Sequence, residues 1–103
     1  MQFDHIGVPT KTPREGEVYI EAAKVHVTSP DAHPYRVEFL RFEKGSPMPA
    51  AMQKNSHTAF CVDDLARALE HEEVLVAPFD ATPALRVAFI RKDGLILELM
   101  QKR

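Results

Sequence analysis

The stretch VAFIRKDGLILELM at residues 87–100 decides how the second half of the chain folds. Two apolar runs flank Asp93-Gly94, and Asp-Gly between such runs is a strong signal for a tight β-hairpin. We therefore expect strands over residues 84–90 and 95–100, joined by a turn over 91–94. The second strand carries one carboxylate, Glu98, among aliphatic neighbours.

Residues 55–83 precede this hairpin and predict a strand, a helix and a further strand. Residues 56–62, SHTAFCV, have the composition of a half-buried strand. Asp63 or Asp64 is a suitable N-cap for a helix over residues 65–72, where apolar residues recur at helical spacing. Residues 74–77 then predict another strand.

The first half of the chain predicts four strands, over residues 3–8, 17–20, 24–28 and 35–42. A turn over residues 29–34 separates the third from the fourth. Pro9 and Pro13 remove backbone donors between the first two strands, so we expect this crossover to lack a proper helix. Residues 45–55 hold two prolines and little periodicity, which is typical of a linker.

The two halves repeat each other. His5 in the first strand matches His57 in the fifth, and Glu38 in the second strand of one hairpin matches Glu98 in the other. The repeat predicts an α+β fold of two βαβββ-like modules, residues 1–45 and 55–103, joined by a linker over 46–54. At 103 residues the chain forms one domain.

Composition excludes several classes of protein. Thirteen Lys and Arg against fifteen Asp and Glu give a net charge of −2, and neither sign is segregated, so a nucleic-acid surface is not expected. Cys61 is the only cysteine, which excludes an internal disulfide and favours a reducing compartment. The start lacks the pattern of a secretory signal and no apolar run is long enough to span a bilayer. We expect a cytoplasmic protein without a membrane or nucleic-acid partner.

The order of elements resembles the vicinal oxygen chelate superfamily, which includes glyoxalase I, methylmalonyl-CoA epimerase and the fosfomycin and bleomycin resistance proteins. The strongest local pieces are FDHIGV at residues 3–8, HTAFCVDDL at 57–65 and the hairpin at 87–100, and the resemblance covers nearly the whole chain. It implies that the modules curl one mixed sheet into an open cup holding a divalent metal. Carried over residue by residue, the metal ligands would be His5, Glu38, His57 and Glu98.

This donor set suits the chemistry that the resemblance implies. Two imidazoles and two carboxylates match a borderline divalent ion such as Zn, Ni, Co, Mn or Fe, and leave positions open for two adjacent substrate oxygens. Each residue alone also has an ordinary interpretation, since a strand histidine is more often structural and Glu38 could pair with Arg86 or Arg91. Glu38 is the least secure ligand because Glu43 is close by in the sequence. Four candidate ligands at matched places favour the metal.

The other histidines and the cysteine are expected to lie outside the site. His26, His33 and His71 fall on a strand of unassigned facing, in a turn and on a helix. Cys61 has no readable nucleophile partner, so we expect an inert, small hydrophobe.

Period-two alternation predicts which further side chains face the cup. The predicted substrate pocket comprises Phe3, Arg36, Leu40, Phe42, Ala59, Cys61, Ile96 and Met100. It would be mostly apolar, with Arg36 as the one cation near its wall.

Three functions are compatible with this sequence. The first is a metal-dependent isomerase or lyase of the glyoxalase and epimerase type, in which Glu98 or Glu38 moves a proton on a small substrate with adjacent oxygens. The second is a resistance transferase of the fosfomycin type, which would need His5 and His57 with Glu98 but not Glu38. The third is a non-catalytic module that holds a small molecule. An extradiol dioxygenase is disfavoured, because those enzymes generally carry extra modules.

Self-association is also expected. An open cup leaves sheet edges and an apolar back face, including Val37, Phe39, Leu97 and Leu99, that one short helix cannot cover. We therefore expect a homodimer.

Overall fold

The computed structural model describes residues 1–103 and contains one mixed sheet of eight strands. The strands are β1 (Gln2–Pro9), β2 (Val18–Ile20), β3 (Val25–Val27), β4 (Val37–Phe42), β5 (His57–Cys61), β6 (Glu73–Thr82), β7 (Leu85–Lys92) and β8 (Leu95–Lys102). Their spatial order is β2-β3-β4-β1-β5-β8-β7-β6. The predicted α+β fold is therefore confirmed, with strand ends that differ by a few residues.

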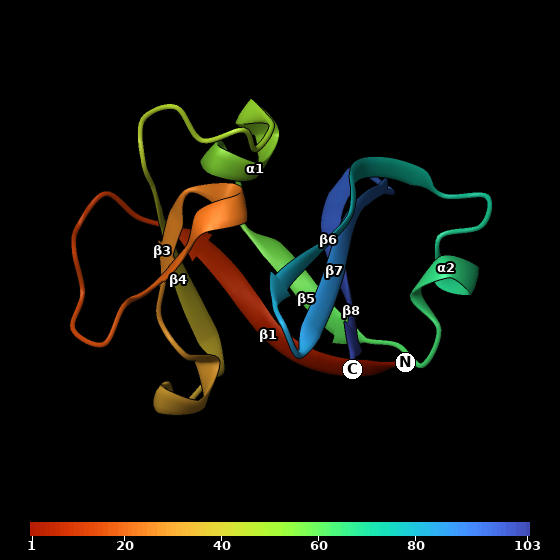
Figure 1. The fold of residues 1–103 in the computed structure, drawn as a ribbon, viewed down its shortest axis with the longest axis horizontal. Coiled ribbons are helices and arrows are strands. Elements are labelled where there is room, and N and C mark those ends of the chain that lie inside the picture. The colour runs from red at the N-terminus through yellow and green to blue at the C-terminus, as the bar shows by residue number, and fades with distance from the viewer.

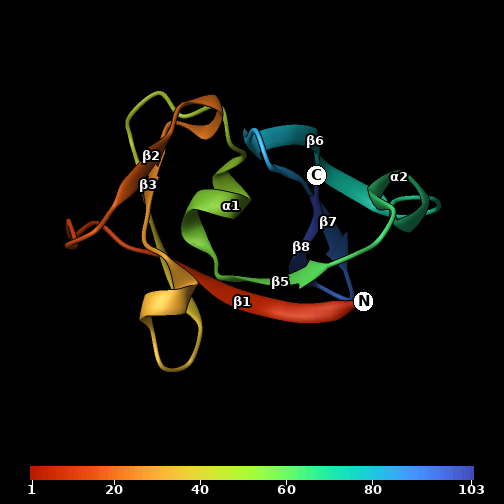
Figure 2. The same cartoon turned by 60° about the horizontal axis from the view of Figure 1, so that its bottom comes forward.

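The sheet has the symmetry that the sequence repeat predicts. In each half the first strand pairs in parallel with the last one, β1 with β4 and β5 with β8. The two first strands pair antiparallel at the centre of the sheet. The outer strands of each half then rise on either side, so that the sheet forms an open cup with β1 and β5 at its base (Figures 1 and 2).

The helix predicted over residues 65–72 is much shorter in the structure. α2 spans Leu65–Ala68, and Asp64 caps it by accepting a hydrogen bond from the backbone N–H of Arg67 at 3.1 Å. His71 adopts a left-handed conformation, with φ of 65°, and turns the chain toward β6. The prediction was too long because β6 begins at Glu73 and the chain has to reverse before it.

β6 itself runs beyond the predicted residues 74–77. It is an edge strand with three register shifts against β7, and Pro78 lies within it. An edge strand with bulges tolerates a proline, because the missing N–H is not needed by a second neighbour.

The expected linker contains a helix that the sequence pattern did not predict. α1 spans Ala50–Lys54, follows Pro49 directly and lies within the cup, between its two walls (Figure 2). Five residues are too few for helical periodicity to be visible. The signal available was local, since Ala, Met, Gln and Lys are strong helix formers and proline is common at a helix start.

The first crossover, residues 10–17, has no helix, as expected. Two side-chain contacts hold this segment against β4 instead. The guanidinium of Arg14 lies 3.6 Å from the ring centroid of Phe39, and Glu17 accepts hydrogen bonds from Arg41 at 2.7 and 3.0 Å. Part of the outer face of the first module is therefore covered by an irregular segment.

Three apolar clusters form the core. One fills the base of the cup on the α1 side, one lies between α2 and strands β7 and β8, and a smaller one lies beside β3 and β4. Leu99 was expected on an uncovered back face. Instead it is buried in the apolar cluster that contains Leu65 of α2. None of the helices has the length and apolar character needed to cross a membrane.

Candidate metal centre

The four predicted ligands come together at the base of the cup. His5 and His57 lie on the central strands β1 and β5, and Glu38 and Glu98 lie on the flanking strands β4 and β8. Their ligand atoms all lie within 4.8 Å of one another. The cluster joins residues from both modules, so it forms only when the two halves pair.

Strand register explains this convergence. His5 is opposite Ala59, and His57 is opposite Gly7, so one pair of residues separates the two histidines along the central ladder. Glu38 lies beside Gly7 and Glu98 beside Ala59. Each small residue thus sits between a histidine and a glutamate that reach across it.

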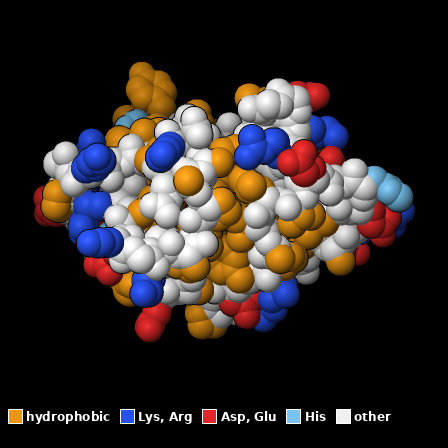
Figure 3. All heavy atoms as spheres, turned by 90° about the horizontal axis from the view of Figure 1, so that it is seen from above, with side chains coloured by type: hydrophobic (Ala, Val, Ile, Leu, Met, Phe, Trp, Pro, Cys, Tyr) orange, Lys and Arg blue, Asp and Glu red, His pale blue; other side chains and the backbone are white.

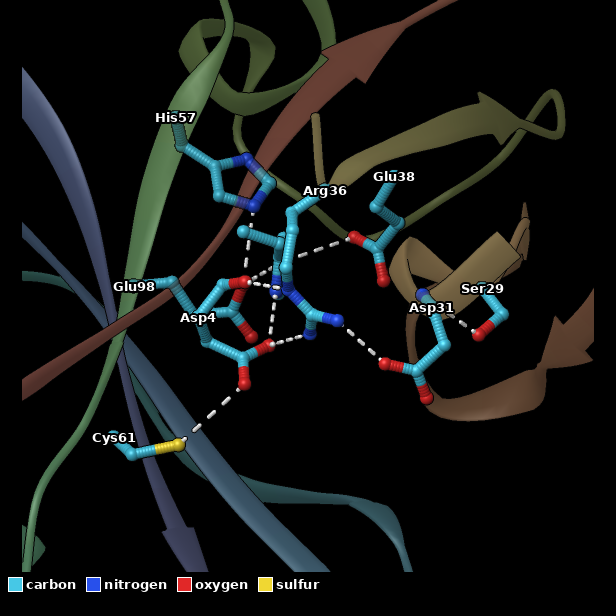
Figure 4. Close-up of polar contacts among 9 residues, drawn as sticks. Asp4, Ser29, Asp31, Arg36, Glu38, His57, Cys61 and Glu98 are labelled. Carbon is cyan, nitrogen blue, oxygen red and sulfur yellow. Dashed lines mark hydrogen bonds and ion pairs between the residues drawn. The ribbon is translucent and has the colours of Figure 1, made fainter. Parts of the chain in front are cut away.

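Three distances within the cluster fit one coordination shell. Nε2 of His57 is 3.0 Å from Oε1 of Glu98, and Nε2 of His5 is 3.3 Å from the same oxygen and 3.4 Å from Oε1 of Glu38. In a tetrahedral or octahedral shell with bonds of about 2.0–2.2 Å, neighbouring ligand atoms are roughly 2.8–3.6 Å apart. The carboxylates and the His57 ring therefore already point toward one common centre (Figure 4).

The donors are buried and incompletely satisfied. The side chains of His5 and His57 are 4% and 1% exposed, and those of Glu38 and Glu98 are 16% and 9% exposed. Nε2 of His5 has no hydrogen-bond partner, although two carboxylate oxygens lie near it. A buried nitrogen without a partner costs free energy, and a metal ion is one way to satisfy it.

The same cluster shifts the titration of its members. Burial alone would lower the pKa of His5, but the adjacent carboxylates of Glu38 and Glu98 outweigh it and raise that pKa to about 11. Burial opposes ionisation of Glu98, yet the contacts with His5 and His57 leave its pKa below the usual range. The two carboxylates therefore stabilise positive charge within the cluster, on a protonated His5 or on a bound cation that replaces its proton.

Gly7 is needed to make room for His57. A Cβ at Gly7 would overlap three atoms of the His57 imidazole. On the other side the His57 ring packs edge-on against Phe89, with ring centroids 5.2 Å apart. His57 is thus held between the backbone of β1 and a core aromatic ring, which fixes its direction.

A cavity of about 270 Å³ opens above the cluster. His5, Glu38 and Glu98 lie in its wall, and most of the remaining lining is hydrophobic, including Val18, Val25, Phe42, Met48, Met52 and Phe79. Hydrophobic side chains also gather in the middle of the face seen from above in Figure 3, with charged groups around them. The volume is below the roughly 300–1,000 Å³ typical of drug-sized ligand pockets, so the cavity suits a small molecule.

The predicted pocket was only partly right. Leu40 and Phe42 line the cavity, whereas the other six predicted residues do not: Phe3, Arg36, Ala59, Cys61, Ile96 and Met100. The residues that replace them come mainly from β2, β3, β6, β7 and the segment around α1. Alternation along a single strand could not identify these elements.

Each of these errors has a physical reason. A register shift between Phe3 and His5 turns Phe3 away from the cup, where its ring packs edge-on against Phe60. The side chain of Met52 enters the base of the cup and is 2% exposed, so it covers residues that would otherwise face the cavity. These covered residues are Ala59, Ile96 and Met100, which belong to the same cluster.

Arg36 and Cys61 are engaged outside the cavity. Arg36 has a left-handed backbone, with φ of 59°, and its guanidinium contacts Asp4 and Asp31. The Cys61 thiol lies 3.7 Å from Oδ1 of Asp4, and burial together with this carboxylate raises its pKa. A raised pKa agrees with an unreactive thiol.

The ordinary pairings considered for the candidate residues are not found. Arg86 pairs with Asp80, and Arg91 lies 3.6 Å from Glu73, so neither arginine forms an ion pair with Glu38. Glu43 contacts His26 at 3.0 Å, away from the cluster. His33 and His71 also lie outside it, as predicted.

Comparison with known proteins supports the fold. The structure is similar to a crystal structure of a hypothetical protein from Bacillus halodurans C-125, with a TM-score of 0.75 and 15% sequence identity. The match covers 99% of this chain and 94% of that chain. No protein-family model and no curated protein sequence matches the chain. At this identity the likeness concerns the fold alone.

Proposed function

We propose that the chain is a short member of the vicinal oxygen chelate superfamily and a metal-dependent isomerase or lyase. Its substrate would be a small, uncharged molecule with two adjacent oxygens. The observation that carries this proposal is the convergence of two histidines and two glutamates, of which His5, Glu38 and Glu98 line an apolar cavity.

The donor set is the basis for a divalent ion at this site. His5, Glu38, His57 and Glu98 would hold it, because nitrogen and carboxylate donors suit Zn, Ni, Co, Mn or Fe. When bound, such an ion supplies Lewis-acid polarisation of the substrate oxygens. The chain's own residues then have to orient the substrate and move a proton.

The two glutamates differ in how firmly they are held, which suggests different roles. Oε1 of Glu98 contacts both His57 and His5, whereas Glu38 contacts only His5, at 3.4 Å. The Glu38 side chain is also more exposed, at 16% against 9%. We infer that Glu98 anchors the site and that Glu38 acts as the general base, removing a proton from the substrate carbon next to the carbonyl.

The lining of the cavity restricts the substrate. It contains no lysine or arginine. A phosphonate or phosphate would therefore find no lysine or arginine to hold its oxygens, which disfavours the fosfomycin-type alternative. The apolar walls instead favour a substrate whose remaining groups are hydrocarbon.

Proton exchange tests this function without knowledge of the natural substrate. Small uncharged α-hydroxy ketones are incubated in D₂O with the metal-loaded protein. NMR then follows the exchange with solvent of the proton on the hydroxyl-bearing carbon next to the carbonyl. Exchange should require both metal and protein. Glu38→Gln should abolish exchange and retain the metal, whereas Glu98→Gln should lose metal as well.

Glu43→Gln is the matched control, because Glu43 also pairs with a histidine but lies outside the cluster. It should exchange protons like the unmodified chain. Exchange that persists in Glu38→Gln would contradict the assignment of the base. Absence of exchange with every ketone, in protein that binds metal and ketone, would contradict the isomerase or lyase.

A second candidate function is a non-catalytic module that holds a small apolar molecule. The predominantly hydrophobic lining of the cavity favours it, since affinity there does not need the metal. Binding of apolar ligands that is equally strong with and without added metal, together with absence of proton exchange, would support this alternative.

A further inference from the structure

A bulge in β1 places two neighbouring side chains on the same side of the sheet. Successive residues of a regular strand point to opposite faces, so Asp4 should point away from His5. The register between β1 and β5 shifts between Phe3 and His5, which leaves Asp4 as the extra residue. Its carboxylate oxygen Oδ2 lies 2.8 Å from Nδ1 of His5.

Asp4 is itself held by groups from other parts of the chain. Nε of Arg36 donates a hydrogen bond to the Asp4 carbonyl at 2.6 Å, and another nitrogen of the same guanidinium lies 3.6 Å from Oδ2. The Cys61 thiol reaches the other carboxylate oxygen, Oδ1. The side chain of Asp4 is 21% exposed, so these contacts form in a partly desolvated setting.

Arg36 is positioned for this contact by its backbone. Its φ of 59° is uncommon for a residue with a side chain, and its carbonyl accepts a hydrogen bond from the N–H of Ile6 at 3.0 Å. The guanidinium also donates to Asp31 at 2.6 Å (Figure 4). One arginine therefore joins the β1 bulge to the turn that precedes β4.

We propose that Asp4 is a positioning residue for His5, and that Arg36 holds it in place. The Nδ1–H of His5 donates to the Asp4 carboxylate, which fixes the ring and leaves Nε2 directed at Glu38 and Glu98. A carboxylate behind an imidazole also makes the opposite nitrogen a stronger donor to a metal. The inference rests on the proposed metal site only for its consequence, because the ring orientation exists without an ion.

The first measurement uses metal-free protein. Proton-detected ¹⁵N spectra of labelled histidine report whether a ring N–H is hydrogen-bonded and protected from exchange. The unmodified chain and Glu43→Gln should show a slowly exchanging Nδ1–H signal from His5. Asp4→Ala should lose this signal, and Asp4→Asn should keep it, because an amide oxygen still accepts the hydrogen bond.

The second measurement is the Zn²⁺ affinity of the same proteins. Asp4→Ala should weaken binding by about 10- to 100-fold, the usual effect of removing such a partner, with a smaller loss in Asp4→Asn. Arg36→Gln should weaken it in the same direction, and Glu43→Gln should not change it.

The two measurements separate this inference from the metal site. If the unmodified chain binds no Zn²⁺ but the ¹⁵N signals behave as described, the positioning role stands and the metal function fails. If Asp4→Ala binds Zn²⁺ like the unmodified chain, or keeps a protected Nδ1–H, the positioning role is wrong. Should Asp4→Ala fail to fold, the loss in Asp4→Asn decides, and unchanged affinity there overturns the proposal.

Discussion

Replacing Gly7 with alanine tests the geometry of the site without removing any proposed ligand. Gly7 lies opposite His57 in the central ladder, and an added Cβ would overlap the imidazole ring. The ring cannot move freely, because Phe89 packs against it from another side. Gly7→Ala therefore has to displace His57 from its direction toward Glu98.

The size of the effect follows from this overlap. The overlapping atoms are ring atoms of a buried side chain, so relief requires a shift of the ring by about 1 Å, and misplacement of that size can cost about 100-fold in function. We expect Zn²⁺ affinity to fall by about that factor. Overpacking a core also costs typically 1–3 kcal/mol of stability, so the melting temperature should fall as well.

Calorimetric titration of metal-free protein with Zn²⁺ measures the affinity, and circular dichroism measures the stability. Gly16→Ala is the matched control. Gly16 has φ of 81° and nothing within 4 Å of an added Cβ, so this change strains the backbone away from the site. It should lower stability and leave Zn²⁺ affinity unchanged. If Gly7→Ala folds and binds Zn²⁺ as tightly as the unmodified chain, the proposed role of His57 as a ligand is refuted.

Three further predictions concern stability and assembly. Met52→Ala removes a side chain that is 2% exposed, so it should cost about 2–5 kcal/mol in denaturant unfolding, and a cost below about 1 kcal/mol would contradict the burial of α1. The hydrogen bonds from Arg41 lower the pKa of Glu17 below its ordinary value of 4.5. The ionised carboxylate therefore stabilises the fold at pH values above 4.5, and this stability is lost as the pH falls through the lowered pKa. Melting curves from pH 7 to about pH 3 should therefore show Glu17→Gln less stable than the unmodified chain at neutral pH and equal to it in acid, whereas a constant difference would exclude this pair as the cause. The predicted homodimer should appear in sedimentation velocity at micromolar concentration, and a monomer there would show the prediction to be wrong. Candidates for the dimer contact are Tyr35 and Leu95, which are 80% and 59% exposed in the single chain.

Much of the fold was predictable because the chain repeats itself. Alternating apolar residues and the Asp93-Gly94 turn predict the strands, and the matched histidines and glutamates predict which strands meet. The four-residue cluster follows from that pairing, since His5 and His57 can converge only if β1 and β5 lie side by side. Long-range symmetry thus carried more information than any single motif.

The remaining features depend on tertiary contacts that one strand does not encode. The bulge at Asp4 turns Phe3 out of the cup and brings a carboxylate behind His5. Met52 enters the cup from a helix too short to leave a periodic pattern. The cavity wall was missed for the same reason, because most of it comes from β2, β3, β6, β7 and the segment around α1, which carry none of the four predicted ligands.

The most direct test of the central claim is the stoichiometry of Zn²⁺ binding, measured by calorimetry on the metal-stripped chain beside His57→Ala. If His5, Glu38, His57 and Glu98 form one centre, the unmodified chain should bind one ion per chain at neutral pH. His57→Ala should lose most of that affinity while keeping its far-ultraviolet circular dichroism spectrum. Absence of binding by the folded, unmodified chain to Zn²⁺, Ni²⁺, Co²⁺, Mn²⁺ and Fe²⁺ alike would contradict the account.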